Sequence, residues 1–263
     1  MIRTPRLAAR RIRQSLRFAN GLQVLWQIAT GPTRWGTEEL VFELRSGETV
    51  RCPNVAGARV PVYELFIEDA YRLAELTEGL RDDFVALDIG GQIGCFSTAL
   101  ARHAPKATIH TFEASPTTAD WLRRNIAGND LGERVFPRHL AVTEHVGIME
   151  FADNGSGSGL NGVTAPAGST TVVEVPCTTF GAAVAQAGGR VDLVKIDTEG
   201  AEYDIVLSSD PASWASVQRV VIEYHPVPGR SWAELARFFA AVGLVVTRIE
   251  AADEGLGTAW LRR

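Results

Sequence analysis

The sequence has few cysteines and no long apolar run. Its three cysteines, Cys52, Cys95 and Cys177, are far apart and form no CxxC pair, so neither a disulfide framework nor a zinc knuckle is expected. No window of about 18 consecutive apolar residues occurs, and therefore no transmembrane helix is predicted. The arginine-rich start lacks the apolar stretch of a signal peptide. These absences predict a cytoplasmic protein with no membrane partner.

Acidic residues are absent before Glu38. The same segment holds seven arginines, and because the whole chain has a formal net charge of −5, the remainder carries −12. This acidic body disfavours nucleic acid as a partner, and a solvated helix face is the simplest explanation of the arginines. Apolar residues recur at spacings of three to five from Leu7 to Trp26, which predicts an amphipathic helix. Its apolar stripe is a candidate surface for a homodimer or a lid.

The length and composition fit one extended α/β domain preceded by a cap. The chain has 263 residues, of which 46% are hydrophobic, enough for a sizeable core. Residues 1–80 are predicted to form an N-terminal helix and cap region, with a hairpin of strands at Leu40–Leu44 and Thr49–Cys52. Helical periodicity returns over Tyr63–Leu76. Residues 81–263 are predicted to form the main domain.

From residue 84 onward, strand candidates alternate with helix candidates. This alternation is typical of a parallel sheet covered on both faces, so we predict a doubly wound, Rossmann-like α/β fold. Val146–Phe151 and Thr171–Val175 are expected to form an inserted hairpin, and the glycine-rich stretch 153–162 a mobile connector or lid. The strands are expected at Phe84–Ile89, Thr108–Phe112, Arg138–Val142, Val191–Ile196, Val217–Ile222 and Leu244–Ile249, with helices beginning near Ile93, Thr117, Thr179, Ala201 and Ser231.

A glycine-rich turn follows the first of these strands. In Leu87-Asp-Ile-Gly-Gly-Gln-Ile-Gly94, a buried strand leads through the turn into a helix, an arrangement that offers backbone N–H groups to a nucleotide-type cofactor. The dinucleotide fingerprint G-x-G-x-x-G would need glycine at positions 88 and 93, where this chain has Asp88 and Ile93. An NAD-dependent oxidoreductase therefore stays only as an alternative.

Asp88 and Glu113 indicate which cofactor the turn binds. An aspartate at the strand end would repel a pyrophosphate but suits a cationic ligand, and S-adenosylmethionine carries an ammonium, a sulfonium and a ribose without phosphates. Glu113 ends the next strand 25 residues after Asp88, close to the roughly 20-residue offset of a ribose-binding acid. We therefore expect S-adenosylmethionine as cofactor. A noncatalytic protein that keeps the pocket is the other alternative.

A second group of acids follows the strand at Val191–Ile196. Asp197, Glu199 and Glu202 lie within six residues, and their repulsion implies a cation, a protonated base or a hydrogen-bonded cofactor nearby. Helix capping explains the two glutamates well but Asp197 poorly. The next strand ends in Glu223 and His225, which are expected at the same edge.

Methyl transfer to an oxygen requires removal of the proton of the acceptor. A histidine, with a pKa near ~6.5, can accept this proton if a carboxylate orients it. We expect His225 to be the base, helped by Asp197 and Glu223. Alternatively, these three residues share a divalent metal ion that polarises the acceptor oxygen, or His225 only caps the loop before Pro226.

These residues resemble the FkbM family of S-adenosylmethionine-dependent methyltransferases. The resemblance covers about residues 60–250 and implies a seven-stranded sheet whose last strand, here Thr258–Arg262, is antiparallel. It also implies O-methylation, with a hydroxyl of a small natural product or sugar-containing metabolite as acceptor. The motifs that carry it are the glycine turn, Phe112-Glu-Ala-Ser-Pro116, Leu122-Arg-Arg-Asn125, Val194-Lys-Ile-Asp-Thr-Glu-Gly-Ala-Glu202 and Ile222-Glu-Tyr-His-Pro226.

The resemblance also assigns site residues. The family turn commonly reads D-I-G-A-N-x-G, so Gly91 and Gln92 replace an alanine and an asparagine, while Lys195–Gly200 match the KIDxEG motif. The first 60 residues carry no strong family signature and are expected to set acceptor choice or oligomerisation. The cofactor-binding residues predicted in this way are Asp88, Gly90, Gly91, Gln92, Gly94, Glu113, Ala114, Ser115 and Asp197.

Overall fold

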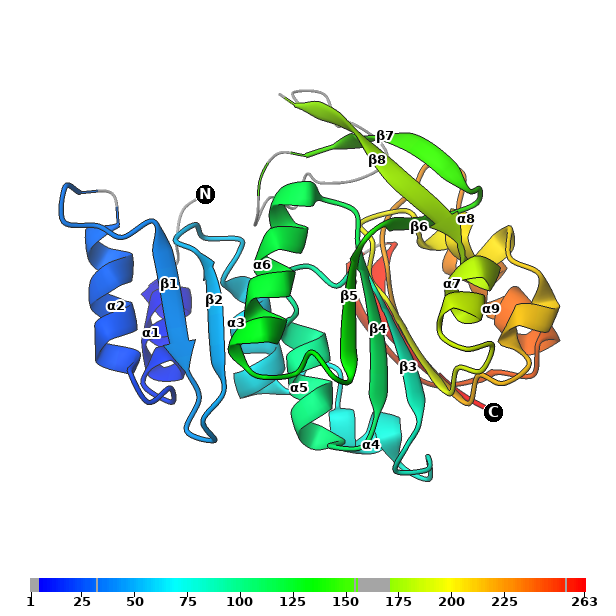
Figure 1. Ribbon diagram of the computed structural model, residues 1–263, viewed down its shortest axis with the longest axis horizontal. Helices are drawn as coiled ribbons and strands as arrows, with labels where there is room; N and C mark the ends of the chain where they lie inside the picture. Colours follow the sequence, from blue (N-terminus) through cyan, green and yellow to red (C-terminus); the bar gives the residue numbers. More distant parts are fainter. Residues whose placement is uncertain (1–4, 32, 154, 156–170, 254) are drawn as a thin grey trace.

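A central sheet with helices on both faces dominates the computed structural model, with the N-terminal region at one end (Figure 1). The structure describes residues 5–31, 33–153, 155, 171–253 and 255–263. The predicted connector or lid at 153–162 therefore lies outside the described residues, apart from Asp153 and Gly155. Within the described ranges, every helix is too short or too polar to cross a membrane.

The central sheet has seven strands in the order β11-β12-β10-β9-β3-β4-β5. Neighbouring strands in the described part run parallel except at β12, which is antiparallel to both β10 and β11. The predicted α/β class and the antiparallel last strand are confirmed. The strands are β3 (Val85–Ile89), β4 (Thr108–Glu113), β5 (Val135–His139), β9 (Leu193–Ile196), β10 (Arg219–Tyr224), β11 (Val245–Asp253) and β12 (Leu256–Arg262).

Alternate residues of the strands feed two hydrophobic clusters. Ala86 and Leu193 join a cluster with α5 and the N-terminal region, whereas Leu87 and Val194 join a cluster with α7, α8 and α9. Because successive side chains of a strand point to opposite faces, these clusters cover the two faces of the sheet. The helices are α5 (Cys95–His103), α6 (Pro116–Gly128), α7 (Phe180–Gln186), α8 (Glu202–Leu207) and α9 (Trp232–Ala241), with a 3₁₀ turn, η2, at Pro211–Trp214.

Capping side chains explain where several helices begin. The Oγ of Ser115 accepts from the backbone N–H of Thr118 at the start of α6, and Thr179 accepts from Ala182 at the start of α7. Ser231 and Glu234 form a reciprocal capping box at α9, which satisfies backbone groups that a helix start leaves open. The predicted starts of these helices agree with the structure within one residue.

The N-terminal region departs from the prediction in two places. The expected first helix is two helices, α1 (Pro5–Ser15) and α2 (Gly21–Thr30). They separate because the side chain of Asn20 bonds to the backbone of the following hairpin, at Val41 O and Glu43 N. That hairpin, β1 (Glu39–Glu43) with β2 (Thr49–Pro53), is confirmed.

The predicted helix over Tyr63–Leu76 is also divided. It consists of α3 (Val60–Tyr63), the π-helix η1 (Glu64–Glu68) and α4 (Leu73–Thr77). Between η1 and α4, Asp69 and Arg72 adopt left-handed backbone angles, with φ of 50° and 52°. A right-handed helix cannot continue through such residues, so the segment turns and carries Tyr71 toward the sheet.

The third predicted strand of the sheet, Arg138–Val142, combines two different strands. β5 ends at His139, and after Leu140 the chain enters β6 (Ala141–Thr143), which pairs with β8 (Val172–Thr179) in a separate three-stranded sheet. The third member is β7 (Gly147–Ala152), antiparallel to β8, which confirms the inserted hairpin. Because β6 follows β5 directly, this small sheet lies beyond the carboxyl end of β5 (Figure 1).

The cap region and the central sheet share one hydrophobic core. Leu40, Val62 and Leu76 belong to the same cluster of buried residues as Phe84 and Val221. The proposed division between residues 80 and 81 stays a prediction, and the packing across it is continuous.

Candidate functional site

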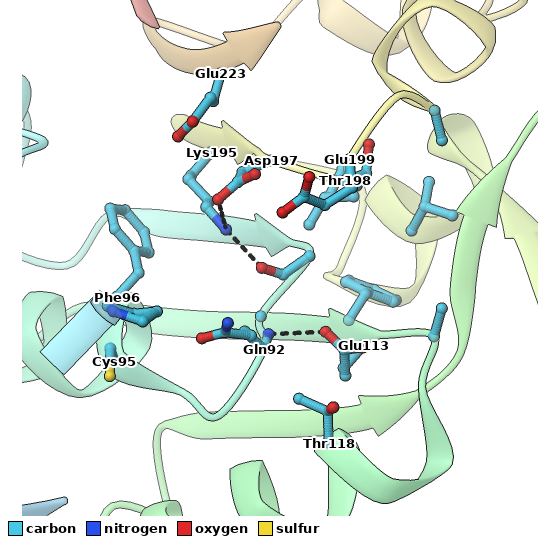
Figure 2. A pocket seen from close by; sticks show the side chains of 18 of the residues that line it. Gln92, Cys95, Phe96, Glu113, Thr118, Lys195, Asp197, Thr198, Glu199 and Glu223 are labelled. Atoms are coloured by element: carbon cyan, nitrogen blue, oxygen red, sulfur yellow. Dashed lines mark hydrogen bonds and ion pairs between the residues drawn. The ribbon is translucent and has the colours of Figure 1, made fainter. Parts of the chain in front are cut away.

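A cavity of about 380 Å³ opens at the carboxyl ends of β3, β4, β9 and β10. In parallel α/β sheets, this edge is where ligands bind. The walls come from three parts of the chain. The central sheet supplies Glu113, Asp197 and Glu223, the small sheet supplies Phe151, and the cap region supplies Tyr71. Glu113 and Glu223 lie at opposite ends of the cavity, with Gln92 beside Glu113 and with Lys195 and Asp197 between the two ends (Figure 2).

The glycine turn after β3 is closely packed. A Cβ on Gly90, whose φ is +79°, would lie 1.7 Å from the carbonyl oxygen of Asp197. A Cβ on Gly91 would lie 2.1 Å from Oγ1 of Thr111. This contact explains why the chain has glycine where the related turn commonly has alanine. Both glycines and Gln92 line the cavity, whereas Gly94 begins α5 behind it.

Glu113 is held by two backbone donors. The N–H of Gln92 donates to its Oε2 and the N–H of Ser115 to its Oε1, each at 2.8 Å. Gln92 reaches this position in a left-handed conformation, with φ of 48°. Burial raises the pKa of Glu113 to about 7, although these two hydrogen bonds favour the ionised form. Glu113 and Ala114 line the cavity as expected, while Ser115 caps α6 outside it.

Asp88 lies beneath the turn. Its carboxylate is fully buried and accepts hydrogen bonds from Oγ of Ser97 at 2.7 Å and Oγ1 of Thr111 at 3.2 Å. The third partner is the ammonium of Lys195, 3.2 Å away. Among the described residues, those that line the cavity do not include Asp88. The carboxylate supports the turn from behind, and the predicted role of Asp88 in cofactor binding stays a prediction.

Lys195 connects the glycine turn with the second acidic group. Its Nζ donates to the carbonyl oxygen of Gly90 at 2.6 Å and lies 3.7 Å from Oδ2 of Asp197 (Figure 2). Burial by itself would lower the pKa of Lys195, but Asp88 and Asp197 raise it above its usual value. The site prediction did not include Lys195. A lysine within an otherwise apolar, buried strand was the available signal, because buried lysines are rare unless paired.

Carboxylates crowd the other end of the cavity. The carboxylates that line the cavity here are those of Glu64, Asp197, Glu199 and Glu223. Burial, and next the charge of Asp197, raise the pKa of Glu223 to about 7. Burial and neighbouring carboxylates also raise the pKa values of Glu64 and Glu199. Glu223 therefore exchanges a proton near neutral pH, which is the property that a general base or acid requires.

His225 is paired rather than available as a base. Its Nδ1 lies 3.0 Å from Oε1 of the buried Glu202, and its Nε2 lies 3.4 Å from Glu199 and 3.9 Å from Glu223. Burial alone would lower the pKa of His225, but Glu202, Asp197 and Glu199 raise it to about 9. The imidazole is then protonated at neutral pH. The role of His225 as the base therefore stays a prediction, which its pairing with Glu202 disfavours.

The metal alternative fits these residues poorly. The predicted set was Asp197, Glu223 and His225, whereas the ligand atoms that lie within 4.8 Å of one another among the described residues are those of Asp197, Glu202 and His225. However, Glu202 already accepts hydrogen bonds from Thr198, Gly200 and His225. A divalent ion bound by the three would have to displace these bonds together with a proton of His225.

Tyr71 is the main site residue that the sequence analysis missed. Its hydroxyl donates to Oδ2 of Asp197 at 3.1 Å and lies 3.5 Å from Oε2 of Glu223. It comes from the cap region, more than 120 positions before either carboxylate, and no local pattern marks it. Other unpredicted residues that line the cavity include Glu64, Phe96, Thr118, Leu140, Val142 and Phe151.

Comparisons with known proteins show which family this chain matches. The model of the methyltransferase FkbM domain matches residues 88–246. The 31-O-demethyl-FK506 methyltransferase FkbM of Streptomyces tacrolimicus is 28% identical over 220 residues, which are 72% of this chain and 82% of that protein. The AMB antimetabolite synthetase AmbE of Pseudomonas aeruginosa is 26% identical over 222 residues, 71% of this chain, and the chain spans only 10% of that synthetase.

A solved structure shows the same fold. The crystal structure of the methyltransferase FkbM from Methylobacillus flagellatus superposes with a TM-score of 0.51 at 12% sequence identity. The superposition covers 97% of this chain and 59% of the other.

Proposed function

The chain belongs to the FkbM family of methyltransferases, and we propose that it transfers a methyl group from S-adenosylmethionine to a hydroxyl of a small natural product or sugar-containing metabolite. The observation that carries this proposal is the division of one cavity into two ends. Glu113 and the glycine turn lie at one end, and Glu223 and Asp197 at the other.

The residues around Glu113 fit S-adenosylmethionine. The carboxylate of Glu113 is positioned to accept hydrogen bonds from ribose hydroxyls. Leu140, whose N–H donates to the carbonyl oxygen of Glu113 at 3.0 Å, and Val142 add an apolar wall that suits a flat base. Gly90 and Gly91 let the turn pack closely against Asp197 and Thr111 while its backbone lines the cavity. S-adenosylmethionine, when bound, supplies a methyl group on a cationic sulfur, and the acidic walls favour that charge.

Glu223 is the base in this proposal. With a pKa of about 7 it is partly ionised at neutral pH, and it lines the cavity. The carboxylate of Glu223 would take the proton of the acceptor hydroxyl, while bound S-adenosylmethionine would give up its methyl group to the hydroxyl oxygen and leave as S-adenosylhomocysteine. Protonated His225 stays paired with Glu202 and orders the turn between β9 and α8.

The relatives support an oxygen acceptor of the natural-product type. The name of the Streptomyces protein describes methylation of an O-demethyl compound, and that of the Pseudomonas protein describes the synthesis of an antimetabolite. Because this chain matches only a tenth of the latter, the acceptor stays a proposal.

Titration calorimetry and a transfer assay test the function together. S-adenosylhomocysteine is expected to bind the full chain, and labelled S-adenosylmethionine to pass its methyl group to a hydroxylated acceptor in a screen of candidates. No binding at millimolar ligand would overturn the proposal. Binding of NAD in the same titration would favour the oxidoreductase. Tight cofactor binding without transfer to any acceptor would favour the noncatalytic alternative.

A homodimer through the N-terminal segment is a separate proposal. Leu22 and Trp26, one turn apart on α2, have 75% and 66% of their surface exposed, and Ile12 and Leu16 are also exposed. Exposed large apolar side chains that recur on one helix face are characteristic of an interface.

A further inference from the structure

We propose that Tyr71 is a positioning residue for methyl transfer, which fixes the carboxylates of Asp197 and Glu223 relative to the acceptor hydroxyl. This inference rests on the proposed function and adds a residue from the cap region to the reaction. Its basis is one buried hydroxyl placed between two carboxylates of neighbouring strands.

The distances assign different tasks to the two carboxylates. The hydroxyl of Tyr71 has one proton, and the nearer acceptor is Oδ2 of Asp197 at 3.1 Å, while Oε2 of Glu223 is 3.5 Å away. A contact of 3.5 Å is at the limit of a hydrogen bond. Asp197 is therefore engaged by the phenol as well as by Lys195, whereas Glu223 keeps its oxygens available for the proton of the acceptor.

The phenol is a permanent donor. Tyr71 is 7% exposed, and burial, together with the charges of Asp197 and Glu223, raises its pKa well above the usual value. Its proton therefore stays in place at any pH at which the protein functions. Without this donor, two carboxylates in one cavity would repel each other and move apart.

The surrounding structure holds Tyr71 in one position. The edge of the ring packs against Phe96, with centroids 5.5 Å apart and planes at 86°. The indole Nε1 of Trp260 donates to its carbonyl oxygen at 3.0 Å. On either side, Asp69 and Arg72 adopt left-handed conformations that non-glycine residues avoid. Such strain concentrates at functional sites, where the surroundings enforce it.

The sharpest test is Tyr71→Phe, which removes the hydroxyl and keeps the ring. We expect kcat to fall about 10-fold or more, as for the loss of a hydrogen bond to a charged group, with the affinity for S-adenosylhomocysteine and the thermal midpoint nearly unchanged. Tyr63→Phe is the matched control. Tyr63 is also buried, its hydroxyl bonds to Ser15 Oγ at 2.8 Å, and it lies outside the cavity lining. The kcat of the Tyr63→Phe variant is expected to equal that of the wild type.

A double-mutant cycle separates positioning from a general structural effect. If Tyr71 acts through Glu223, Tyr71→Phe should add little to the loss caused by Glu223→Gln. An unchanged kcat in Tyr71→Phe, or losses that multiply in the double variant, would overturn the inference.

A measurement without turnover keeps the inference distinct from the proposed function. Carboxyl carbon NMR should show the titration of Glu223 moving to higher pH in Tyr71→Phe, because the lost donor had favoured the ionised pair. Asp197, His225, Glu64 and Lys195 also face Glu223 and are unchanged in both samples. If the wild type transfers no methyl group but this shift occurs, the proposed function fails and the positioning stands. No shift would contradict the positioning.

Discussion

The two ends of the cavity hold their carboxylates in different ways. Glu113 accepts two backbone hydrogen bonds of 2.8 Å, from the N–H of Gln92 in the glycine turn and from the N–H of Ser115 just after β4. Glu223 is surrounded by side chains instead, with Tyr71 at 3.5 Å and His225 at 3.9 Å. Backbone donors change little when side chains are replaced. The end at Glu113 is therefore a fixed part of the fold, while the end at Glu223 can be retuned by single substitutions.

The largest effect is expected from Gly90→Ala, which affects both ends. The new Cβ would meet the carbonyl oxygen of Asp197 at 1.7 Å, so the backbone of the turn or of β9 must move. We expect the affinity for S-adenosylhomocysteine, measured by calorimetry, to fall ~100-fold or more, as is typical when a binding geometry is displaced by about 1 Å.

Gly128→Ala is the control for this substitution, because a Cβ there has nothing within 4 Å. It should bind the ligand as the wild type does. Wild-type affinity in Gly90→Ala would show that the close approach of the turn to Asp197 is not required.

Paired substitutions of Glu113 and Glu223 test the division of the cavity directly. Glu223→Gln is expected to lower kcat by about 10²-fold or more, the contribution of a general base, and to keep the affinity for S-adenosylhomocysteine. Glu113→Gln should instead weaken that affinity about 10-fold, because its amide would face a backbone donor. Initial rates measure kcat and calorimetry measures the affinity for S-adenosylhomocysteine in both variants. If Glu223→Gln and Glu113→Gln lowered kcat to a similar degree and weakened the affinity to a similar degree, the division of the cavity into two ends would be contradicted.

His225→Gln should act mainly on stability. Because the pKa of His225 is raised from 6.5 to about 9, its pairing with Glu202 stabilises the fold fully below pH 6.5. This stabilisation is lost as the pH rises through about 9. The free energy of unfolding of the wild type should therefore contain a contribution of about 3 kcal/mol that disappears over this window.

Urea unfolding at several pH values measures this contribution, and in His225→Gln it should be absent. His103→Gln, at the exposed end of α5, is the matched control and should keep the pH dependence of the wild type. If His225→Gln kept the wild-type pH dependence of the unfolding free energy, the pair of His225 and Glu202 would not be its cause.

The smallest effect on catalysis is expected at the surface far from both ends. Trp26→Ser with Leu22→Ser should convert a dimer into a monomer and leave kcat unchanged, because neither residue lines the cavity. Analytical ultracentrifugation of the wild type and the variant decides this. A wild-type mass of one chain would end the proposal of a homodimer.

The contrast between contacts of the local backbone and contacts of distant side chains also explains which features could be predicted from the sequence. The glycine turn, Glu113 and the strand-end acids Asp197 and Glu223 were found because their placement follows from strand order and local spacing. The protonation of His225 could not be predicted, because it depends on Glu202, a partner on the first turn of α8. The position of Asp88 was missed for a related reason, since only the structure shows Ser97, Thr111 and Lys195 around it.

Tyr71 lay beyond any such reasoning. Its place depends on two left-handed residues in a segment whose periodicity predicts a continuous helix. The division of the third strand was missed as well, because Leu140 interrupts neither the apolar pattern nor the β propensity. Pairing with β8 across the small sheet decides it, and pairing partners are not contained in local sequence.

The shared core of the cap region and the central sheet has a practical consequence for anyone who wishes to express or graft part of this protein. A fragment that begins at residue 81 would lose the cap residues, among them Leu40, Val62 and Leu76, from the buried cluster that also contains Ala86 and Val221. It would also lose Tyr71 and Glu64 from the cavity wall. The smallest unit that carries the whole pocket therefore includes the cap, and exchange of acceptor specificity between relatives would have to transfer both parts together.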